Sequence, residues 1–168
     1  MPITEEIKKI CCMEAKKNRL DKVLLMAVIE VESAGDPKAY RFEPAFWERY
    51  LKNNDDWKDR DAKEVSASYG LMQLMYTTAW GLGWRGDGPD LYEPVINIKL
   101  GAKLLHDLIK SIAKSPDNSL WPIDIALARY NGGYKNNPDP EGRLRNQGYL
   151  DKVKRIYWKL RTTEKDCD

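Results

Sequence analysis

The sequence holds few of the residues that bind metals or build disulfide frameworks. Its 168 residues include one histidine and three cysteines. Cys11 and Cys12 are adjacent and Cys167 lies near the end, so no C-x-x-C spacing is present. This argues against a zinc site and a disulfide scaffold, but is compatible with one bridge from Cys11 or Cys12 to Cys167. His106 lies among leucines and is expected to be structural. We therefore expect no metal and no cofactor.

Long hydrophobic runs and an excess of one charge are also missing. No apolar stretch reaches the roughly 20 residues that span a membrane, and residues 1–6 lack the pattern of a secretory signal. The net charge is only +2, too weak to indicate nucleic-acid binding. The glycines of residues 81–88 follow no predicted strand and precede no Lys-Ser/Thr pair, so they form no phosphate loop. We expect no membrane insertion and no nucleic acid, and a protein that acts as a monomer.

The remaining composition is typical of a mainly α-helical domain. Hydrophobic residues make up 42% and charged residues 32% of the chain, as in ordinary globular proteins. Apolar spacing and capping residues predict helices over residues 4–18, 21–33, from 44, 94–115, 122–132 and 147–161. Tyr50 and Val95 are expected to face inward. Residues 53–64 and 136–142 are expected to be exposed connections, and a β element, if present, is small and lies between residues 38 and 69. Residues 1–168 would form one domain of about six to eight helices.

One carboxylate interrupts an apolar helix face. At about 100° per residue, Leu25, Val28 and Ile29 fall on one side of the helix over residues 21–33, and Glu32 projects into the same stripe. Burial favours the neutral form of a carboxyl group and raises its pKa. An acid that stays protonated near neutral pH can act as a general acid, so Glu32 is the candidate catalytic residue. The alternative is a structural glutamate paired with an arginine or with backbone donors.

Three separated motifs occur in a recognisable order. They are Val31-Glu32-Ser33 at a helix end, Gly70-Leu71-Met72-Gln73, and Ala128-Arg129-Tyr130-Asn131-Gly132-Gly133. Asn97 and Gly101 add an N-x-x-x-G stretch between the last two. This set resembles the lytic transglycosylases that share the goose-type lysozyme fold, over about residues 23–131. The resemblance implies a mainly α, lysozyme-like domain.

The resemblance also implies roles for the matched residues. Glu32 would be the single catalytic acid/base. The other residues would surround it and contact the substrate: Ser33, Ser68, Gly70, Met72, Gln73, Tyr130 and Asn131. Met72 and Gln73 would line the groove, and Tyr130 would point its hydroxyl towards the acid or the reacting sugar. Asn131 would fix local backbone and substrate, and Ser33 would support the helix end. The structural alternatives are a core position for Met72 and a helix-terminal one for Asn131.

The implied reaction is cleavage of the β-1,4 bond between MurNAc and GlcNAc in peptidoglycan. Glu32 would protonate the glycosidic oxygen. It would then accept a proton from the C6 hydroxyl of the sugar, which closes onto C1 to give 1,6-anhydro-MurNAc without water. The alternative is a hydrolytic muramidase, which usually needs a second carboxylate. Hydrolytic goose-type enzymes place an Asp two residues after the glutamine of G-L-M-Q, where this chain has Met75.

Glu43 is the candidate second carboxylate. The stretch Arg41-Phe42-Glu43-Pro44-Ala45-Phe46 resembles the F-E-P-H-x-F segment of some phage-associated muramidases, with Ala45 in place of the histidine. Glu43 would serve as a base, orient Arg41, or cap the helix that begins at Pro44. Asp36 is a weaker candidate, since Asp-Pro favours a turn. The segment 36–66 is longer than in compact transglycosylases and leaves the product open.

Aromatic residues supply further candidates for substrate contact. Six Trp and nine Tyr stand against two Phe, and such rings stack on sugars as well as packing in cores. The stacking candidates are Tyr69, Tyr76, Trp80, Trp84 and Tyr134. A third hypothesis, a non-catalytic carbohydrate-binding or phage-structural module, leaves the protonatable Glu32 without a purpose. The expected place of action is the bacterial cell wall, reached through phage lysis as an endolysin, a phage tail, or export of a longer precursor.

Overall fold

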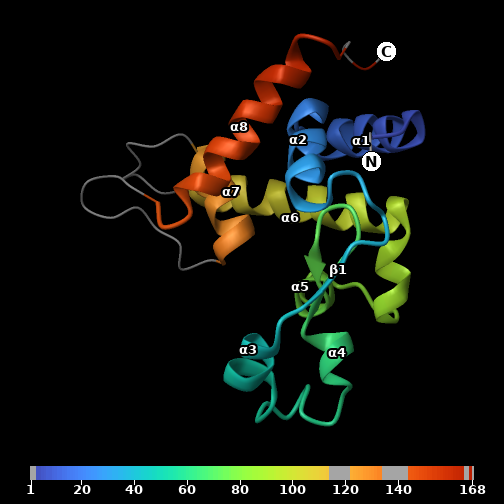
Figure 1. The fold of residues 1–168 in the computed structure, drawn as a ribbon, viewed down its shortest axis with the longest axis vertical. Coiled ribbons are helices and arrows are strands. Elements are labelled where there is room, and N and C mark those ends of the chain that lie inside the picture. The colour runs from blue at the N-terminus through green and yellow to red at the C-terminus, as the bar shows by residue number, and fades with distance from the viewer. Residues whose placement is uncertain (1–2, 114–121, 134–143, 165–166, 168) are drawn as a thin grey trace.

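Five long helices form the larger part of the protein. The computed structural model describes residues 3–113, 122–133, 144–164 and 167. The long helices are α1 (Glu5–Asn18), α2 (Lys22–Ser33), α6 (Pro94–Ala113), α7 (Pro122–Gly132) and α8 (Gln147–Arg161) (Figure 1). They confirm the mainly α prediction, and the predicted ends that fall on described residues agree within one residue. The predicted helix end at 115 lies outside the described residues. The predicted loop over 136–142 and the stacking candidate Tyr134 lie outside the described residues.

Side-chain caps explain where the first helices begin. The Thr4 hydroxyl accepts a hydrogen bond from the backbone N–H of Ile7 at 3.3 Å, and the Asp21 carboxylate accepts one from Val23 at 2.8 Å. Each satisfies a donor that the first turn of a helix leaves unpaired. Both helices end in a left-handed residue, Arg19 after α1 and Ala34 after α2. The capping residues thus place the end of α2, and Glu32 with it.

Helix α2 is the centre of the core. Every side chain from Val23 to Ile29 is buried, and α2 packs against α1 on one side and α8 on the other. Helix α6 packs against α1 and α7 (Figure 1). The C-terminal end of α2 points towards the small sheet (Figure 1). Glu32, in the last turn of α2, therefore lies where the long helices meet the sheet.

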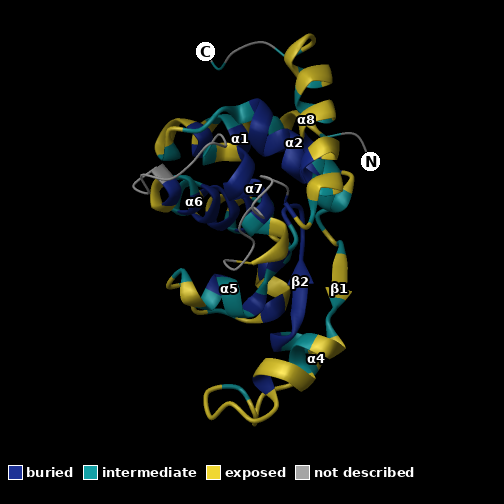
Figure 2. Cartoon of the chain, turned by 90° about the vertical axis from the view of Figure 1, so that its left-hand side faces the viewer, coloured by how far each residue is buried: buried dark blue, intermediate teal, exposed yellow. Residues whose placement is uncertain are grey.

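A three-stranded antiparallel sheet lies beyond this end of α2. Its strands β1 (Tyr40–Phe42), β2 (Ala67–Tyr69) and β3 (Leu74–Met75) follow the order β1-β2-β3. Figure 2 shows that β2 is buried whereas β1 is exposed. The prediction of a small β element is confirmed for β1 and β2, but β3 lies beyond the predicted limit. Strand β3 has only two residues, both apolar, so it shows no alternation that would reveal a strand.

Short helices complete the lower part of the fold. They are α3 (Pro44–Phe46), a π-helix (Trp47–Leu51), α4 (Ala62–Val65), α5 (Tyr76–Gly81) and a 3-10 helix (Gly88–Tyr92). Two burial predictions are wrong here: Tyr50 is 56% and Val95 51% exposed. The Tyr50 ring packs on Phe46 at the surface, with 5.0 Å between ring centroids, and Val95 lies in the first turn of α6 between the partly exposed Pro94 and Ile96.

A disulfide joins the first helix to the chain end. Cys12 of α1 is bonded to Cys167, which decides between the two predicted pairings. Cys11 is buried and free, and burial raises the pKa of its thiol to about 12. The Cys11 thiol therefore stays protonated and unreactive at neutral pH.

Candidate functional site

Glu32 lies in the last turn of α2 with its side chain half-buried. The Tyr149 hydroxyl donates a hydrogen bond to Oε1 of Glu32 at 2.7 Å. Burial raises the pKa of the Glu32 carboxyl, while the Tyr149 hydrogen bond and the positive charge of Arg41 act in the opposite direction. The net effect is a raised pKa, so Glu32 holds its proton to a higher pH than a free glutamate. Because it is partly exposed, it can also reach a substrate.

Tyr149, which holds the acid, comes from α8 and was not predicted from the sequence. Burial and the nearby Glu32 charge raise the pKa of its phenol, so it remains a hydrogen-bond donor. The local sequence offers only the amphipathic pattern of α8 as a signal, because no motif marks this position. Its role depends on the packing of α8 against α2.

Tyr130 lies close to the acid but bonds to another group. Its hydroxyl donates to the backbone carbonyl of Met72 at 2.8 Å. Burial first, and the Glu32 charge second, raise the pKa of this phenol well above its ordinary value. The Glu32 charge therefore acts on the Tyr130 phenol, but the Tyr130 hydroxyl donates its proton to the Met72 carbonyl and not to Glu32.

The turn of residues 70–73 connects the acid helix to the sheet. Ser33 donates from Oγ to the Leu71 carbonyl at 2.8 Å, and Gln73 donates from Nε2 to the carbonyls of Ala39 and Gly70, both at 3.1 Å. Gly70 has a φ of +69°, and a Cβ there would lie 2.7 Å from both Asn97 Nδ2 and the Leu91 carbonyl. The turn therefore requires glycine at this position.

Asn97 stabilises the turn of residues 70–73 through hydrogen bonds of its side chain. Its buried side chain accepts from the Met72 N–H at 2.7 Å and donates to the carbonyls of Tyr69 and Leu91, both at 2.8 Å. The N-x-x-x-G stretch therefore has a structural purpose, since Gly101 makes room for Met72. A Cβ on Gly101 would lie 2.3 Å from the Met72 sulfur.

Met72 and Ser68 are interior residues. The Met72 side chain is 0% exposed and packs beside α6. Met72 therefore occupies the core position that was the structural alternative, and not a place on the wall of the groove. Ser68, in the middle of β2, is buried as well. A direct contact of these two side chains with substrate is therefore contradicted, because other protein atoms cover them.

Asn131 lies exposed near the end of α7. Its Oδ1 accepts a hydrogen bond from Asn146 Nδ2 at 3.1 Å, and Asn146 also donates to the Ala128 carbonyl at 2.9 Å. Asn146 directly precedes α8. The position of Asn131 thus links the end of α7 to the start of the helix that carries Tyr149.

Glu43 forms an ion pair with Arg41, with 2.5 Å between Oε1 and Nε. This is one of the three predicted arrangements. Glu43 also occupies the N-cap position of α3, where its backbone carbonyl accepts from the N–H groups of Phe46 and Trp47, but in the described part of the chain its carboxylate makes no hydrogen bond to the first turn. The Asp36 carboxylate accepts from the Lys38 N–H at 2.8 Å, which is the turn role.

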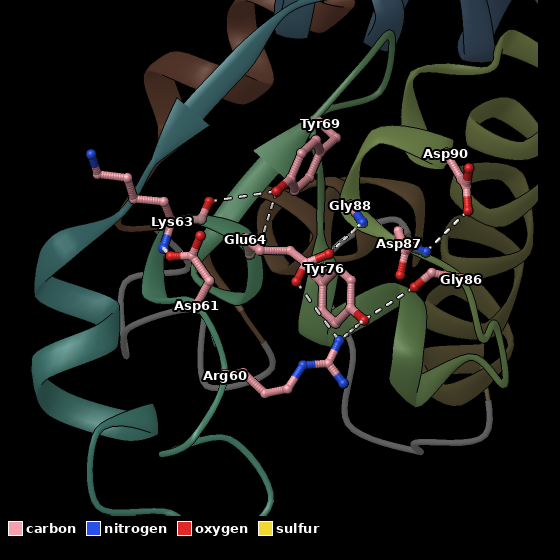
Figure 3. A network of polar contacts seen from close by, with 10 residues as sticks. All are labelled: Arg60, Asp61, Lys63, Glu64, Tyr69, Tyr76, Gly86, Asp87, Gly88 and Asp90. Carbon is pink, nitrogen blue, oxygen red and sulfur yellow. Dashed lines mark hydrogen bonds and ion pairs between the residues drawn. The ribbon is translucent and has the colours of Figure 1, made fainter.

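A polar network anchors the long segment between β1 and β2 (Figure 3). Arg60 donates to the Tyr76 hydroxyl at 2.6 Å, and the Tyr69 hydroxyl donates to the Glu64 carbonyl at 2.9 Å. The Glu64 carboxylate accepts from the Gly88 N–H at 2.8 Å. The expected exposed connection over 53–64 is therefore fixed at its end to β2 and to the first residue of the 3-10 helix.

Two stacking candidates are core residues. Tyr69 and Tyr76 are buried, and the Tyr76 ring is surrounded by Trp57, Trp80 and Trp84 with centroid distances of 5.7 to 6.1 Å. Trp80 and Trp84 are only partly exposed. Tyr69 and Tyr76 belong to the hydrophobic core, and the three tryptophans pack against it, so Tyr69 and Tyr76 are excluded as sugar platforms.

The described residues hold no candidate metal site and no candidate membrane span. Within the described ranges, no three His, Cys, Asp or Glu side chains come together as a metal site. No helix in the same ranges has both the length and the apolar character needed to cross a membrane.

Comparison with known proteins places these residues in one family. Residues 10–150 match the model of the family described as Transglycosylase SLT domain. No curated protein matches the chain. The matched range includes every residue of the site, from Glu32 to Tyr149.

Proposed function

Because the chain belongs to the transglycosylase SLT family of lysozyme-like domains, which act on cell-wall peptidoglycan, we propose that it cleaves the MurNAc-GlcNAc bond with Glu32 as general acid and base. The observation that carries the assignment is the Glu32–Tyr149 pair. It combines a raised carboxyl pKa, partial exposure and a fixed side-chain orientation. These are the properties that a general acid needs.

The first step would be protonation of the glycosidic oxygen. That oxygen is a poor leaving group until it receives a proton, which the neutral Glu32 carboxyl supplies as the C1–O bond breaks. The MurNAc ring then carries positive character at C1 and the ring oxygen. Glu32 becomes a carboxylate, and the hydrogen bond from Tyr149 stabilises this new charge.

The second step would close the sugar on itself. The Glu32 carboxylate accepts the proton of the C6 hydroxyl, and the C6 oxygen forms a bond to C1. The product is 1,6-anhydro-MurNAc, Glu32 regains its proton, and no water is consumed. The residue at the Asp position of hydrolytic goose-type enzymes is Met75, which supports this outcome because a thioether cannot act as a base.

Hydrolysis with Glu43 as a second carboxylate is the alternative outcome. The Arg41 ion pair supports a positioning role for Glu43 instead, since it occupies one carboxylate oxygen of Glu43.

Mass spectrometry of the sugars released from purified peptidoglycan tests the proposal. We expect muropeptides one water lighter than the hydrolytic products from the wild type and from Glu43→Gln, and no release by Glu32→Gln. Glu30→Gln is the matched control on the same helix and should remain active. Reducing MurNAc ends that disappear in Glu43→Gln would establish hydrolysis instead. Release by Glu32→Gln at the wild-type rate would remove Glu32 as the acid.

A further inference from the structure

A row of three side chains crosses the sheet on one face. In the register of the antiparallel strands, Arg41 of β1 is paired with Ser68 of β2, and Ser68 with Met75 of β3. Directly paired residues project to the same face. Neighbouring positions project to the opposite face, where Tyr40 and Tyr69 pack against each other at 5.5 Å between ring centroids.

The Arg41 face is the one directed at the acid. The turn of residues 70–73 bonds to Ser33, next to Glu32, and to Ala39, just before β1. These two bonds hold the end of α2 and the start of β1 against the same turn. The positive charge of Arg41 also acts on the Glu32 carboxyl. On the opposite face, Tyr69 packs against Tyr92, and the Lys38 ammonium lies over the Tyr92 ring.

The Arg41 guanidinium is held at one end and accessible at the other. Its side chain is 65% exposed, and its Nε bonds to Glu43. Glu43 is held in turn by Ser66, which accepts from the Glu43 N–H at 2.8 Å and donates from Oγ to its carbonyl at 2.7 Å. Among the described residues Arg41 has no second ion pair, so its two terminal amino groups are left for another acceptor. These amino groups match the two oxygens of a carboxylate.

We propose that Arg41 binds a carboxylate carried by the lactyl arm of the muramic acid that Glu32 attacks. Glu43 acts as its positioning residue. This specificity rests on the proposed function, because it takes a MurNAc glycan as the substrate. The carboxylate has two possible sources, the free lactyl group of a peptide-free glycan or the acidic residues of an attached stem peptide. An N-acetylglucosamine polymer carries neither.

Binding measurements separate this inference from turnover. Every protein in the test carries Glu32→Gln, so no ligand is cleaved. Three ligands are compared: a glycan with stem peptides, the same glycan after amidase treatment, and a chitin oligosaccharide. We expect Arg41→Gln to weaken binding to one of the first two about tenfold, and to leave chitin binding unchanged. Loss with the first ligand alone identifies the stem peptide, and loss with the second alone identifies the lactyl group.

Two further variants sharpen the result. Arg49→Gln removes the same charge from the π-helix that follows α3, where the guanidinium lies over Tyr50, and should change none of the three affinities. Arg41→Lys keeps the charge without the paired amino groups and should restore only part of the affinity. An equal loss for all three ligands, or no loss for any of them, would overturn the inference. The proposed function is tested separately, by the release of anhydro products from a protein that carries wild-type Glu32.

Discussion

The hydroxyl of Tyr149 lies 2.7 Å from Oε1 of Glu32, although 117 positions separate the two residues in the sequence. The acid belongs to the central helix α2, and its donor belongs to the last described helix, α8. The protonation state of the site therefore depends on how α8 packs against α2.

Removing this hydroxyl should change both the rate and its pH dependence. Tyr149→Phe is expected to lower kcat about ten- to a hundredfold, because a hydrogen bond to a charged group contributes about 1.5–3 kcal/mol. The bond lowers the pKa of Glu32, so its loss should raise that pKa further. The limb of the pH–rate profile on which Glu32 loses its proton should then move to higher pH.

Tyr157→Phe is the matched control for this experiment. It removes a hydroxyl from the same helix, one that donates to Asp21 at 2.8 Å at the opposite end of α2. The control should leave the pH profile in place. A profile that is the same in Tyr149→Phe and the wild type would contradict the role given to Tyr149.

The raised pKa of Glu32 also has a consequence for stability. A group with a higher pKa in the folded state binds more protons there than in the unfolded state, so stability falls as pH rises through the folded pKa. Glu32→Gln keeps an acceptor for Tyr149 without the charge. We expect this variant to have a higher Tm than the wild type at pH 8, and little difference at pH 4. Thermal unfolding across this range checks the sign, and a deficit at pH 8 would contradict it.

Replacing Asn97 should strongly lower the free energy of unfolding. Its buried side chain serves three backbone groups, those of Met72, Tyr69 and Leu91. Leaving each buried group unpaired costs about 1–3 kcal/mol, so Asn97→Ala should lower the free energy of unfolding by about 3 kcal/mol or more. Urea denaturation measures this. The exposed Asn53→Ala serves as control, and equal midpoints for the two variants would disprove the bonding role.

Gly101 and Met72 should show strong coupling in a double-mutant cycle. Gly101→Ala alone would force a methyl group against the Met72 sulfur, and such overpacking costs about 1–3 kcal/mol. With Met72→Ala in place the space is open, and the change should become stabilising because alanine favours helix by about 1 kcal/mol over glycine. Additive free energies of unfolding would show that the two residues are not in contact.

Much of the helical framework follows from local signals, and the exceptions have physical causes. The caps Thr4 and Asp21 and the apolar spacing behind them predict α1 and α2 closely, because these determinants lie within one turn of the helix. Tyr50 and Val95 look apolar enough to be buried, but no neighbouring element covers them. Apolar character alone does not say which side chains of a helix meet the core.

The residues of the site also fall into those that the sequence predicts and those that it does not. Glu32 could be predicted because a carboxylate on an apolar stripe is unusual within its own helix. The core position of Met72 depends on Gly101, and the bond from Tyr149 depends on the approach of α8. These relationships join residues far apart along the chain, so no local pattern reports them.

The disulfide has a consequence for how the protein withstands proteases. Cys12 and Cys167 are 155 positions apart, so nearly the whole chain lies inside one covalent ring. A single cut of the backbone anywhere within the ring opens it without releasing a fragment. The two pieces, one carrying Glu32 and the other Tyr149 when the cut falls between them, stay tethered and can remain packed. A nicked protein should therefore migrate as one species on a non-reducing gel and as two after reduction.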